Sequence, residues 1–328
     1  MRRSPTFFAA GALAASLLLA GCGGQQDNAQ SGGDEESCDA GSGRIGIATG
    51  NSTGVYYVVG GGLAQLINDE TELQATAAET GASVQNVQQL VAGDYDLAFS
   101  LADTAADAVQ GTGSFTEKQD VSSIGRIYSN YTHVVVRADS GITSVADFKG
   151  KRISTGSPKS GTEVIAQRLI EAAGLSQDDV SAQRLDLTKT VDGMKDGSID
   201  GLVWSGGLPT PAITDLFTSM GDEVEFIDVT PQLEALQGVN PVYEEGTITA
   251  ATYELDADVP TIVVPNVLLV RNDMPDNVAC ALTTLVYEDT DKLAAVHPAA
   301  EDIKIEDAEN SDPVPVHPGS QRAIEDLQ

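Results

Sequence analysis

Short apolar runs alternate with amphipathic stretches from residue 44 onward, and this alternation constrains the fold more than any other feature of the sequence. Strands that alternate with helices along a chain are typical of an α/β fold. Apolar residues spaced for one helix face separate the strand-like runs. In the first part of the chain we expect strands at 44–48, 73–78 and 95–101, and helices at 55–68, 83–92 (stopped by Gly93) and 102–110.

The same pattern continues in a second α/β unit that begins near residue 147. Two strands, 121–128 and 132–137, should precede it. Within it and after it we expect a strand that follows the turn at 147–150, helices at 161–173, 191–196 and after Pro209, and strands at 199–204, 224–229 and 262–270. Pro265 interrupts the last of these strands, which predicts an edge or a bulge because proline cannot donate to a sheet ladder.

The first 42 residues carry targeting signals. Met1-Arg2-Arg3 is followed by an apolar stretch, 7–20, that is too short for a comfortable membrane span. Leu19-Ala20-Gly21-Cys22 resembles a bacterial lipobox, so residues 1–22 are predicted to be a lipoprotein signal peptide with lipidation at Cys22. An ordinary secretory signal with a coincidental cysteine is the alternative. Residues 23–42 are rich in Gly, Ser, Gln and Asp, which predicts a flexible tether. We therefore expect a lipid-anchored extracytoplasmic protein.

Two cysteines, Cys38 and Cys280, remain after the signal peptide. In an oxidising compartment two otherwise lone cysteines can pair, so a disulfide and two unrelated thiols are both compatible with the sequence. The three histidines and the absence of a Cys/His spacing argue against a metal site. No cofactor is expected.

Charge excludes several partners. The 49 acidic and 18 basic residues give a net charge of −31. Binding to a nucleic-acid backbone requires a basic surface, and an anionic lipid face repels an acidic one. We expect neither nucleic acid nor a charged membrane surface as a direct partner.

Three polar turns, 49–57, 155–162 and 204–211, each follow a predicted strand and precede a predicted helix. In open α/β sheets, ligands bind at the carboxyl ends of the strands. Gly50-Asn51-Ser52-Thr53-Gly54 also matches G-x-S-x-G, the nucleophile elbow of serine hydrolases. The match lies on the first strand with no oxyanion segment before it, which disfavours Ser52 as a nucleophile. Ordinary helix capping is a further alternative.

Charge depletion favours an anion site at these turns. The segments 49–57, 155–162 and 203–213 contain 28 residues, of which only Lys159 is charged, whereas the chain average of 20% would give about six. Helix N-termini with hydroxyl and glycine residues hold anions through their backbone N–H groups. We interpret the three turns as parts of one cleft.

The runs TGNSTGVYYVVGGGLAQLIN, GSPKSGTE and WSGGLPTPAI, with the later pieces HPAA and VPVHPG, resemble the TAXI family of solute-binding proteins over about residues 43–320. The resemblance implies a type II two-lobed periplasmic binding-protein fold with a ligand cleft between the lobes. Lobe I would comprise 43–130 plus 258–328, and lobe II 131–257. It also implies a non-catalytic protein that serves a TRAP-type permease. Family ligands are small carboxylates such as glutamate, glutamine and 2-oxoglutarate.

The candidate ligand-binding residues come from these turns and the strand ends beside them. They are Gly50, Asn51, Ser52, Thr53, Gly54, Tyr56, Ser100, Ser157, Ser160, Gly161, Thr162, Trp204, Ser205, Gly207 and Pro209. Arg126 and Arg137 are weaker candidates for a carboxylate clamp. An ABC importer or a sensor kinase is the alternative partner, and a secreted serine hydrolase is the alternative function.

Aromatic residues and histidines have less certain roles. Of Tyr56 and Tyr57, one should face the cleft and the other pack in the core, and Trp204 should stack on a ligand or cap a core. His133 is expected on a strand between the lobes, and His297 and His317 in structural or surface positions.

Overall fold

A computed structural model describes residues 37–328, which belong to one compact unit. The predicted signal peptide, Cys22 and most of the tether lie outside the described residues. The strands are β1 (Gly43–Ala48), β2 (Leu73–Ala78), β3 (Leu97–Leu101), β4 (Val121–Arg137), β5 (Arg152–Ser154), β6 (Ser181–Gln183), β7 (Gly201–Gly206), β8 (Val224–Phe226), β9 (Glu244–Ile248) and β10 (Val259–Arg271).

Helices alternate with these strands along the chain, which confirms the predicted α/β class. They are α1 (Val55–Glu70), α2 (Ser83–Ala92), α3 (Ala102–Gln110), α4 (Gly161–Ala172), α5 (Leu187–Asp196), α6 (Pro211–Met220), α7 (Leu233–Val239), α8 (Ala250–Tyr253), α9 (Asp276–Glu288), α10 (Thr290–Val296) and α11 (Pro318–Leu327). No helix in residues 37–328 is long and apolar enough to cross a membrane.

Local sequence signals explain where several elements begin and end. Gly93 ends α2 with φ of 81°, a left-handed conformation that glycine adopts without strain. Helix α5 begins at Leu187, earlier than the predicted 191, because the Asp186 side chain accepts a hydrogen bond from the Lys189 N–H and caps the helix. The strand predicted at 199–204 lies at Gly201–Gly206, since Asp200 N–H bonds to the Arg152 carbonyl before the ladder begins.

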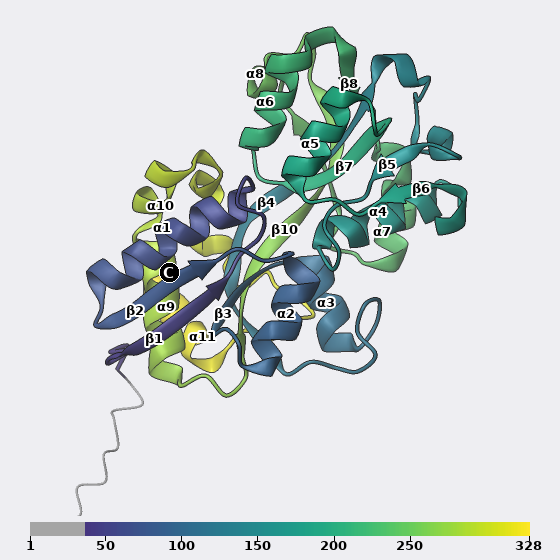
Figure 1. The fold of residues 1–328 in the computed structure, drawn as a ribbon. Helices are drawn as coiled ribbons and strands as arrows, with labels where there is room; N and C mark the ends of the chain where they lie inside the picture. Colours follow the sequence, from purple (N-terminus) through teal and green to yellow (C-terminus); the bar gives the residue numbers. More distant parts are fainter. Residues whose placement is uncertain (1–36) are drawn as a thin grey trace, which may run out of the picture. The chain divides into compact units, whose positions relative to one another are not determined.

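Two long antiparallel strands, β4 and β10, run through the whole molecule and join its two halves (Figure 1). The sheet order is β2-β1-β3-β10-β4-β7-β5-β6, with β8 paired to β4 and β9 to β10. In Figure 1 the half with β1, β2 and β3 carries α1, α2, α3, α9 and α11, and the other half carries α4, α5, α6, α7 and α8. We call these halves lobe I and lobe II.

The strands that cross between the lobes correct two sequence expectations. Residues 121–137 form one continuous strand rather than two, because Tyr131 pairs both with Val263 of β10 and with Gly206 of β7. Pro265 lies inside the sheet and not at an edge. It sits at a register shift between β10 and β4, so the predicted bulge is confirmed and the predicted edge position is wrong.

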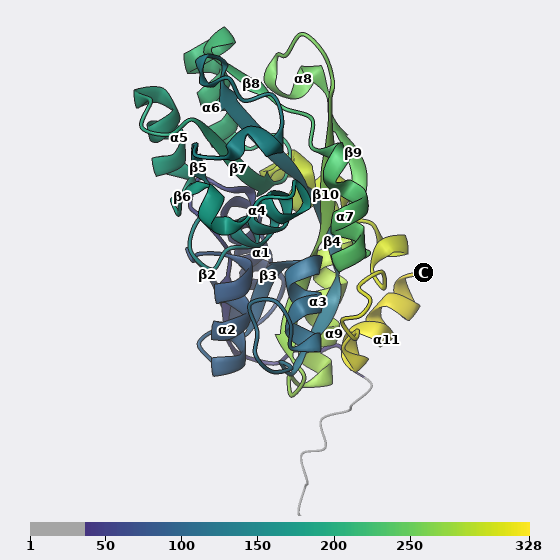
Figure 2. The ribbon, with the colours of Figure 1, turned by 90° about the vertical axis from the view of Figure 1, so that its right-hand side faces the viewer.

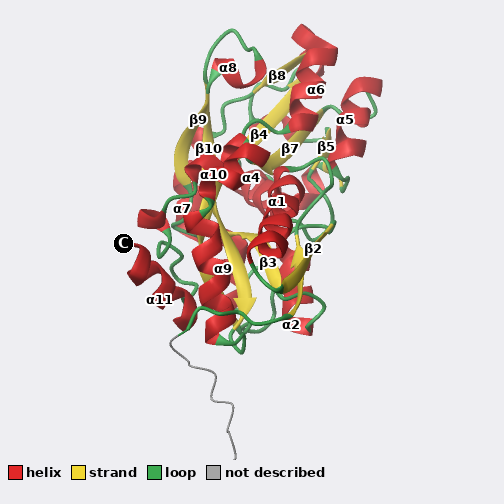
Figure 3. Cartoon of the chain, turned by 90° about the vertical axis from the view of Figure 1, so that its left-hand side faces the viewer, coloured by secondary structure: helices red, strands yellow, loops and turns green. Residues whose placement is uncertain are grey.

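Each lobe buries apolar side chains on both faces of its part of the sheet. In lobe I, α1 packs with α9 and α10 on one face (Figure 3), and α2 and α3 cover the other face (Figure 2). In lobe II, α4 and α7 lie on one face, and α5 and α6 on the other. This layering places the first turns of α1, α2 and α4 where the two lobes meet.

Candidate functional site

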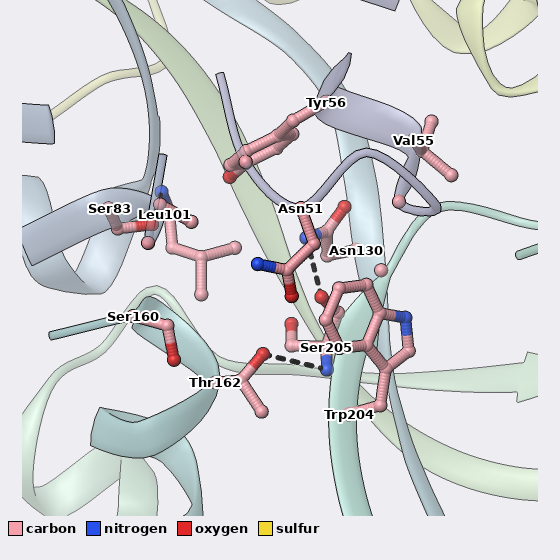
Figure 4. Close-up of a pocket in the computed structure, with 16 residues that line it drawn as sticks. Asn51, Val55, Tyr56, Ser83, Leu101, Asn130, Ser160, Thr162, Trp204 and Ser205 are labelled. Atoms are coloured by element: carbon pink, nitrogen blue, oxygen red, sulfur yellow. Dashed lines mark hydrogen bonds between the residues drawn. The ribbon is translucent and has the colours of Figure 1, made fainter. Parts of the chain in front are cut away.

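One pocket lies at the junction of the lobes, enclosed by strand ends and helix starts (Figure 4). About 410 Å³ of space free of protein atoms lies among its lining residues, with the open solvent at its mouth included. Lobe I and the strand β4 contribute Gly50, Asn51, Gly54, Val55, Tyr56, Gly81, Ala82, Ser83, Leu101 and Asn130, and lobe II contributes Ser160, Gly161, Thr162, Trp204, Ser205 and Gly206. None of the sixteen is acidic, basic or histidine.

The first turns of three helices contribute to this pocket. Val55 and Tyr56 begin α1, Ser83 begins α2, and Gly161 and Thr162 begin α4. All five residues are buried. Within residues 37–328, none of their backbone N–H groups donates a hydrogen bond. Because buried backbone donors are nearly always paired, these five groups call for a ligand or water.

Two of the three helices have N-cap residues with no side-chain acceptor. Gly54 precedes α1 and Ala82 precedes α2, and neither can accept from the N–H groups that follow. Ser160 precedes α4, and its hydroxyl oxygen accepts the Glu163 N–H at 3.0 Å. Helix N-termini carry partial positive charge, so the three turns together favour a negative group.

A buried chain of side-chain hydrogen bonds forms the base of the pocket. The Tyr56 hydroxyl donates to Asn266 Oδ1. Asn266 Nδ2 donates to Asn130 Oδ1 at 2.9 Å, and Asn130 Nδ2 donates to the Ser205 carbonyl at 3.2 Å. This chain crosses from lobe I to lobe II through β10 and β4. Burial raises the pKa of Tyr56 well above its ordinary value, so the phenol stays neutral and can act as a donor.

The two lobes hold each other directly beside the pocket. Asn51 Nδ2 donates to the Ser157 hydroxyl at 3.1 Å, and Asn51 Oδ1 accepts from the Leu187 N–H at 3.3 Å. The hydroxyls of Thr53 and Thr188 lie 3.4 Å apart. These contacts between the lobes describe a closed cleft.

A buried ion pair joins the lobes on a different side. Arg168 of α4 donates to Asp103 at 2.7 Å and to Asp107 at 2.6 Å, both on α3. Tyr243 hydrogen-bonds to Arg168 and to Asp103. Burial raises the pKa of Asp107, and the charge of Arg168 partly offsets that effect. None of these residues lines the pocket, so the cluster serves closure rather than ligand contact.

Nine of the predicted binding residues line the pocket: Gly50, Asn51, Gly54, Tyr56, Ser160, Gly161, Thr162, Trp204 and Ser205. Six do not. Ser52 is exposed, and its N–H donates to Glu79, whereas Ser100 is buried with its hydroxyl on the Leu101 carbonyl. Thr53 and Ser157 contact the opposite lobe. The remaining two are Gly207, packed against Tyr128 and Ala299, and Pro209, whose carbonyl lies 3.1 Å from His297 Nε2.

The aromatic and arginine expectations are met only in part. Tyr56 is both buried and in the pocket, and Tyr57 is 37% exposed, so packing of the second tyrosine in the core is wrong. Trp204 lines the pocket with its ring near Gly54, and its indole N–H donates to Thr210. Arg137 pairs with Asp139 and donates to the Met194 carbonyl; neither it nor Arg126 lines the pocket.

Histidines occupy structural positions. His133 lies on β4, as predicted, with Nδ1 2.9 Å from the Tyr131 carbonyl and Nε2 2.8 Å from the Tyr253 hydroxyl. His297 and His317 each accept, through Nδ1, an N–H at the start of the short helix that follows. Within residues 37–328, no hydrogen bond of these rings involves Ser52.

Sequence reasoning missed a fourth turn and a mid-strand side chain. Gly81, Ala82 and Ser83 follow β2 and precede α2, the same strand–turn–helix pattern that identified the other turns. The adjacent Glu79 masked the low charge of this segment. Asn130 lies within β4, and only strand pairing brings it beside Ser205.

Comparisons with known proteins agree with this architecture. The model of the NMT1-like family matches residues 47–326. A protein of solved structure from Bordetella bronchiseptica is 18% identical, with 87% of this chain and 98% of that chain covered and a TM-score of 0.57. PhnD1 from Prochlorococcus marinus, solved with methylphosphonate, is 9% identical over 80% of this chain and 91% of its own, with a TM-score of 0.53. These likenesses show the two-lobed α/β fold of periplasmic binding proteins.

Proposed function

The chain belongs to the NMT1-like family, and we propose that it is an extracytoplasmic solute-binding protein that captures a small organic anion or amino acid and delivers it to a membrane permease. The observation that carries the proposal is a set of five buried residues at a pocket between two closed lobes, whose backbone N–H groups donate no hydrogen bond within residues 37–328. A closing cleft is the means by which a two-lobed protein removes a small ligand from water.

Simple energetics support anion capture without an arginine. A helix N-terminus favours a negative group by about 0.3–1 kcal/mol, or up to about 2 kcal/mol when it is partly buried. A hydrogen bond to a charged group contributes about 1.5–3 kcal/mol. Three helix starts and a few such bonds therefore reach the roughly −8 kcal/mol of micromolar affinity.

The resemblance to the TAXI family adds glutamate-like amino acids and dicarboxylates to the candidate ligands. Thermal-shift screening of the purified protein against carboxylates, sulfonates and amino acids tests the proposal, since a ligand at 100 times its Kd adds about 2.7 kcal/mol of stability. A shift that saturates with one class of small anion supports it. Failure of every member to stabilise the protein would contradict it.

A TRAP-type permease is the proposed partner, again because of the TAXI resemblance. An ABC importer or a sensor kinase is the alternative. Uptake by membrane vesicles distinguishes the transporters: a TRAP partner needs an ion gradient and no ATP, whereas an ABC partner needs ATP. The purified chain should restore uptake only when an ion gradient is present, and it should do so without ATP.

Binding without catalysis is proposed because Ser52 lies outside the pocket and, within residues 37–328, forms no hydrogen bond with any of the three histidines. A fluorophosphonate probe tests this point directly. Labelling of the wild type that disappears in Ser52→Ala would support a serine hydrolase instead.

A lipid anchor at Cys22 is proposed for localisation. We expect the wild type to fractionate with membranes and Cys22→Ser to be released or mislocalised. Mass spectrometry of an unmodified N-terminus beyond residue 22 would contradict the anchor.

A further inference from the structure

We infer that the pocket selects organic oxyanions with a single negative charge, and that it rejects ligands carrying an ammonium group or a second negative charge. This inference rests on the proposed function, because it takes the pocket as the ligand site. It narrows the candidates, since free amino acids and dicarboxylates are both disfavoured.

The hydroxyls of the lobe II wall are held as donors. Ser160 Oγ accepts the Glu163 N–H at 3.0 Å, and Thr162 Oγ1 accepts the Ser205 N–H at 3.2 Å. Each hydroxyl has one O–H, and within residues 37–328 neither the Ser160 nor the Thr162 O–H donates a hydrogen bond. With one lone pair engaged by the backbone, these O–H groups are free to meet an acceptor on a ligand.

Ser205 supplies a separate observation that points to a ligand. Ser205 is 5% exposed, and its Oγ has no hydrogen-bond partner within the described residues. Figure 4 shows this hydroxyl beside Thr162, facing the space enclosed by the pocket residues. A buried hydroxyl without a hydrogen-bond partner costs free energy. The position of this hydroxyl therefore indicates that a bound molecule supplies the missing partner.

Both side-chain amide oxygens that line the pocket already accept hydrogen bonds from the protein. Asn51 Oδ1 accepts from Leu187 and from Ser157, and Asn130 Oδ1 accepts from Asn266. No carboxylate of residues 37–328 lines the pocket. An α-ammonium group would enter the closed cleft with few partners for its three donors. Burial of an unpaired charge is strongly unfavourable.

A second carboxylate meets the complementary problem. No lysine, arginine or histidine within the described residues lines the pocket, so helix termini and neutral donors are the source of positive potential. Partial charges of about half a unit at each helix start suit one anionic group. The net charge of −31 on the whole chain adds repulsion against a dianion.

A ligand body of modest size and apolar character fits the rest of the wall. Leu101, Val55 and the rings of Tyr56 and Trp204 contribute apolar surface, and glycines line the remainder. A carboxylate and a sulfonate share the chemistry that the donors recognise, so the experiment includes both.

A matched set of five-carbon ligands tests the inference by isothermal titration calorimetry of the intact, folded protein. The set is 2-oxopentanoate, 1-pentanesulfonate, 2-oxoglutarate, norvaline and glutamate. We expect 2-oxopentanoate or 1-pentanesulfonate to bind at least tenfold more tightly than the other three. Equal or tighter binding of norvaline, glutamate or 2-oxoglutarate would overturn the inference and leave the proposed function intact. Binding of none of the five would contradict both.

Ser160→Asp provides a variant with the opposite preference. Aspartate is a good N-cap, so α4 should remain capped while a carboxylate enters the pocket. The variant should bind the monoanion at least tenfold more weakly than the wild type does. The ratio of its affinity for the monoanion to its affinity for norvaline should fall, or norvaline should become the tighter ligand. Ser114→Asp adds the same charge at an exposed loop position and should change neither affinity. An unchanged preference in a folded Ser160→Asp protein, checked by circular dichroism, would overturn the inference.

Discussion

A Cβ atom placed on Gly161 would lie 2.7 Å from the hydroxyl oxygen of Ser83. Gly161 begins α4 in lobe II, and Ser83 begins α2 in lobe I, so this glycine sets how closely two helix N-termini approach across the cleft. The same Cβ would lie 2.5 Å from Leu101 Cδ1. The closed lobes leave no room for any side chain at this position.

Gly161→Ala should therefore weaken ligand binding without unfolding either lobe. Alanine suits the first turn of a helix, but its methyl group must push α4 away from Ser83 and Leu101. We expect at least a tenfold increase in Kd by isothermal titration. Gly61→Ala, in open space on α1, is the matched control and should bind like the wild type. Equal affinity of Gly161→Ala would mean that the cleft closes in another way.

Arg168 provides a second test of closure. Its side chain is 10% exposed, and Asp103 is fully buried, so Arg168→Met leaves two buried carboxylates without a cation. Loss of one partner of a buried ion pair costs about 3–5 kcal/mol. Urea unfolding should show a loss of that order, together with weaker ligand binding.

Arg152→Met is the control for that variant, because Arg152 and Asp200 form a partly exposed pair within lobe II. It should lower stability far less and leave affinity unchanged. Equal effects of the two substitutions would remove the special role given to the buried cluster.

Acid should destabilise the protein through His133. Burial lowers the pKa of His133 from 6.5 to about 4. Because the folded pKa lies below the unfolded one, the stabilisation is complete above about pH 6.5 and is lost as the pH falls from there toward 4. The difference between the folded and unfolded pKa values of His133 corresponds to about 3 kcal/mol of unfolding free energy. Urea unfolding at several pH values should show this slope, and His133→Gln should flatten it between pH 7 and 5.

The tautomer of His133 explains why protonation is costly. With Nδ1–H donating to the Tyr131 carbonyl, Nε2 must accept from the Tyr253 hydroxyl, which itself accepts the Thr210 N–H. A proton on Nε2 would place a donor against that hydroxyl and force it to rearrange. A slope in His133→Gln as steep as that of the wild type would assign the acid lability to other groups.

Cys38 and Cys280 are brought together, with Cα atoms 5.1 Å apart, a separation that suits a disulfide. The bond would tie the start of the folded region to α9. We expect neither thiol to react in denatured, unreduced protein. Reduction should lower stability by about 2–4 kcal/mol. Titration of both thiols without reductant would contradict the pairing.

Sequence patterns predicted the parts of the fold and site that depend on neighbouring residues. The strand–turn–helix pattern placed β1, β2, α1 and α2 closely, and the low charge of the turns identified most of the pocket wall. Contacts between segments that are distant in the sequence were harder to predict. The polar residues Ser129 and Asn130 divided β4 into two predicted strands, although they lie where the strand passes between the lobes and Asn130 serves the pocket.

The orientation of helix residues was also hard to predict. Tyr56 and Tyr57 are adjacent and chemically identical, and only the packing of α1 on Asn266 and Phe99 decides that Tyr56 turns inward. Ser52 matched a catalytic motif by sequence, yet the loop directs it to solvent. Local patterns therefore located the site, and long-range packing decided which side chains face it.

Isothermal titration of Thr162→Asp tests the central claim most directly, with the small anion that gives the largest thermal shift in the wild type as ligand. Thr162 lies in the first turn of α4, where its N–H and O–H groups are proposed to meet the negative group of the ligand. A carboxylate at this position should repel the ligand, and aspartate near a helix N-terminus should preserve the fold. The account predicts no measurable binding by a folded Thr162→Asp protein, and wild-type affinity would show that the anion site lies elsewhere.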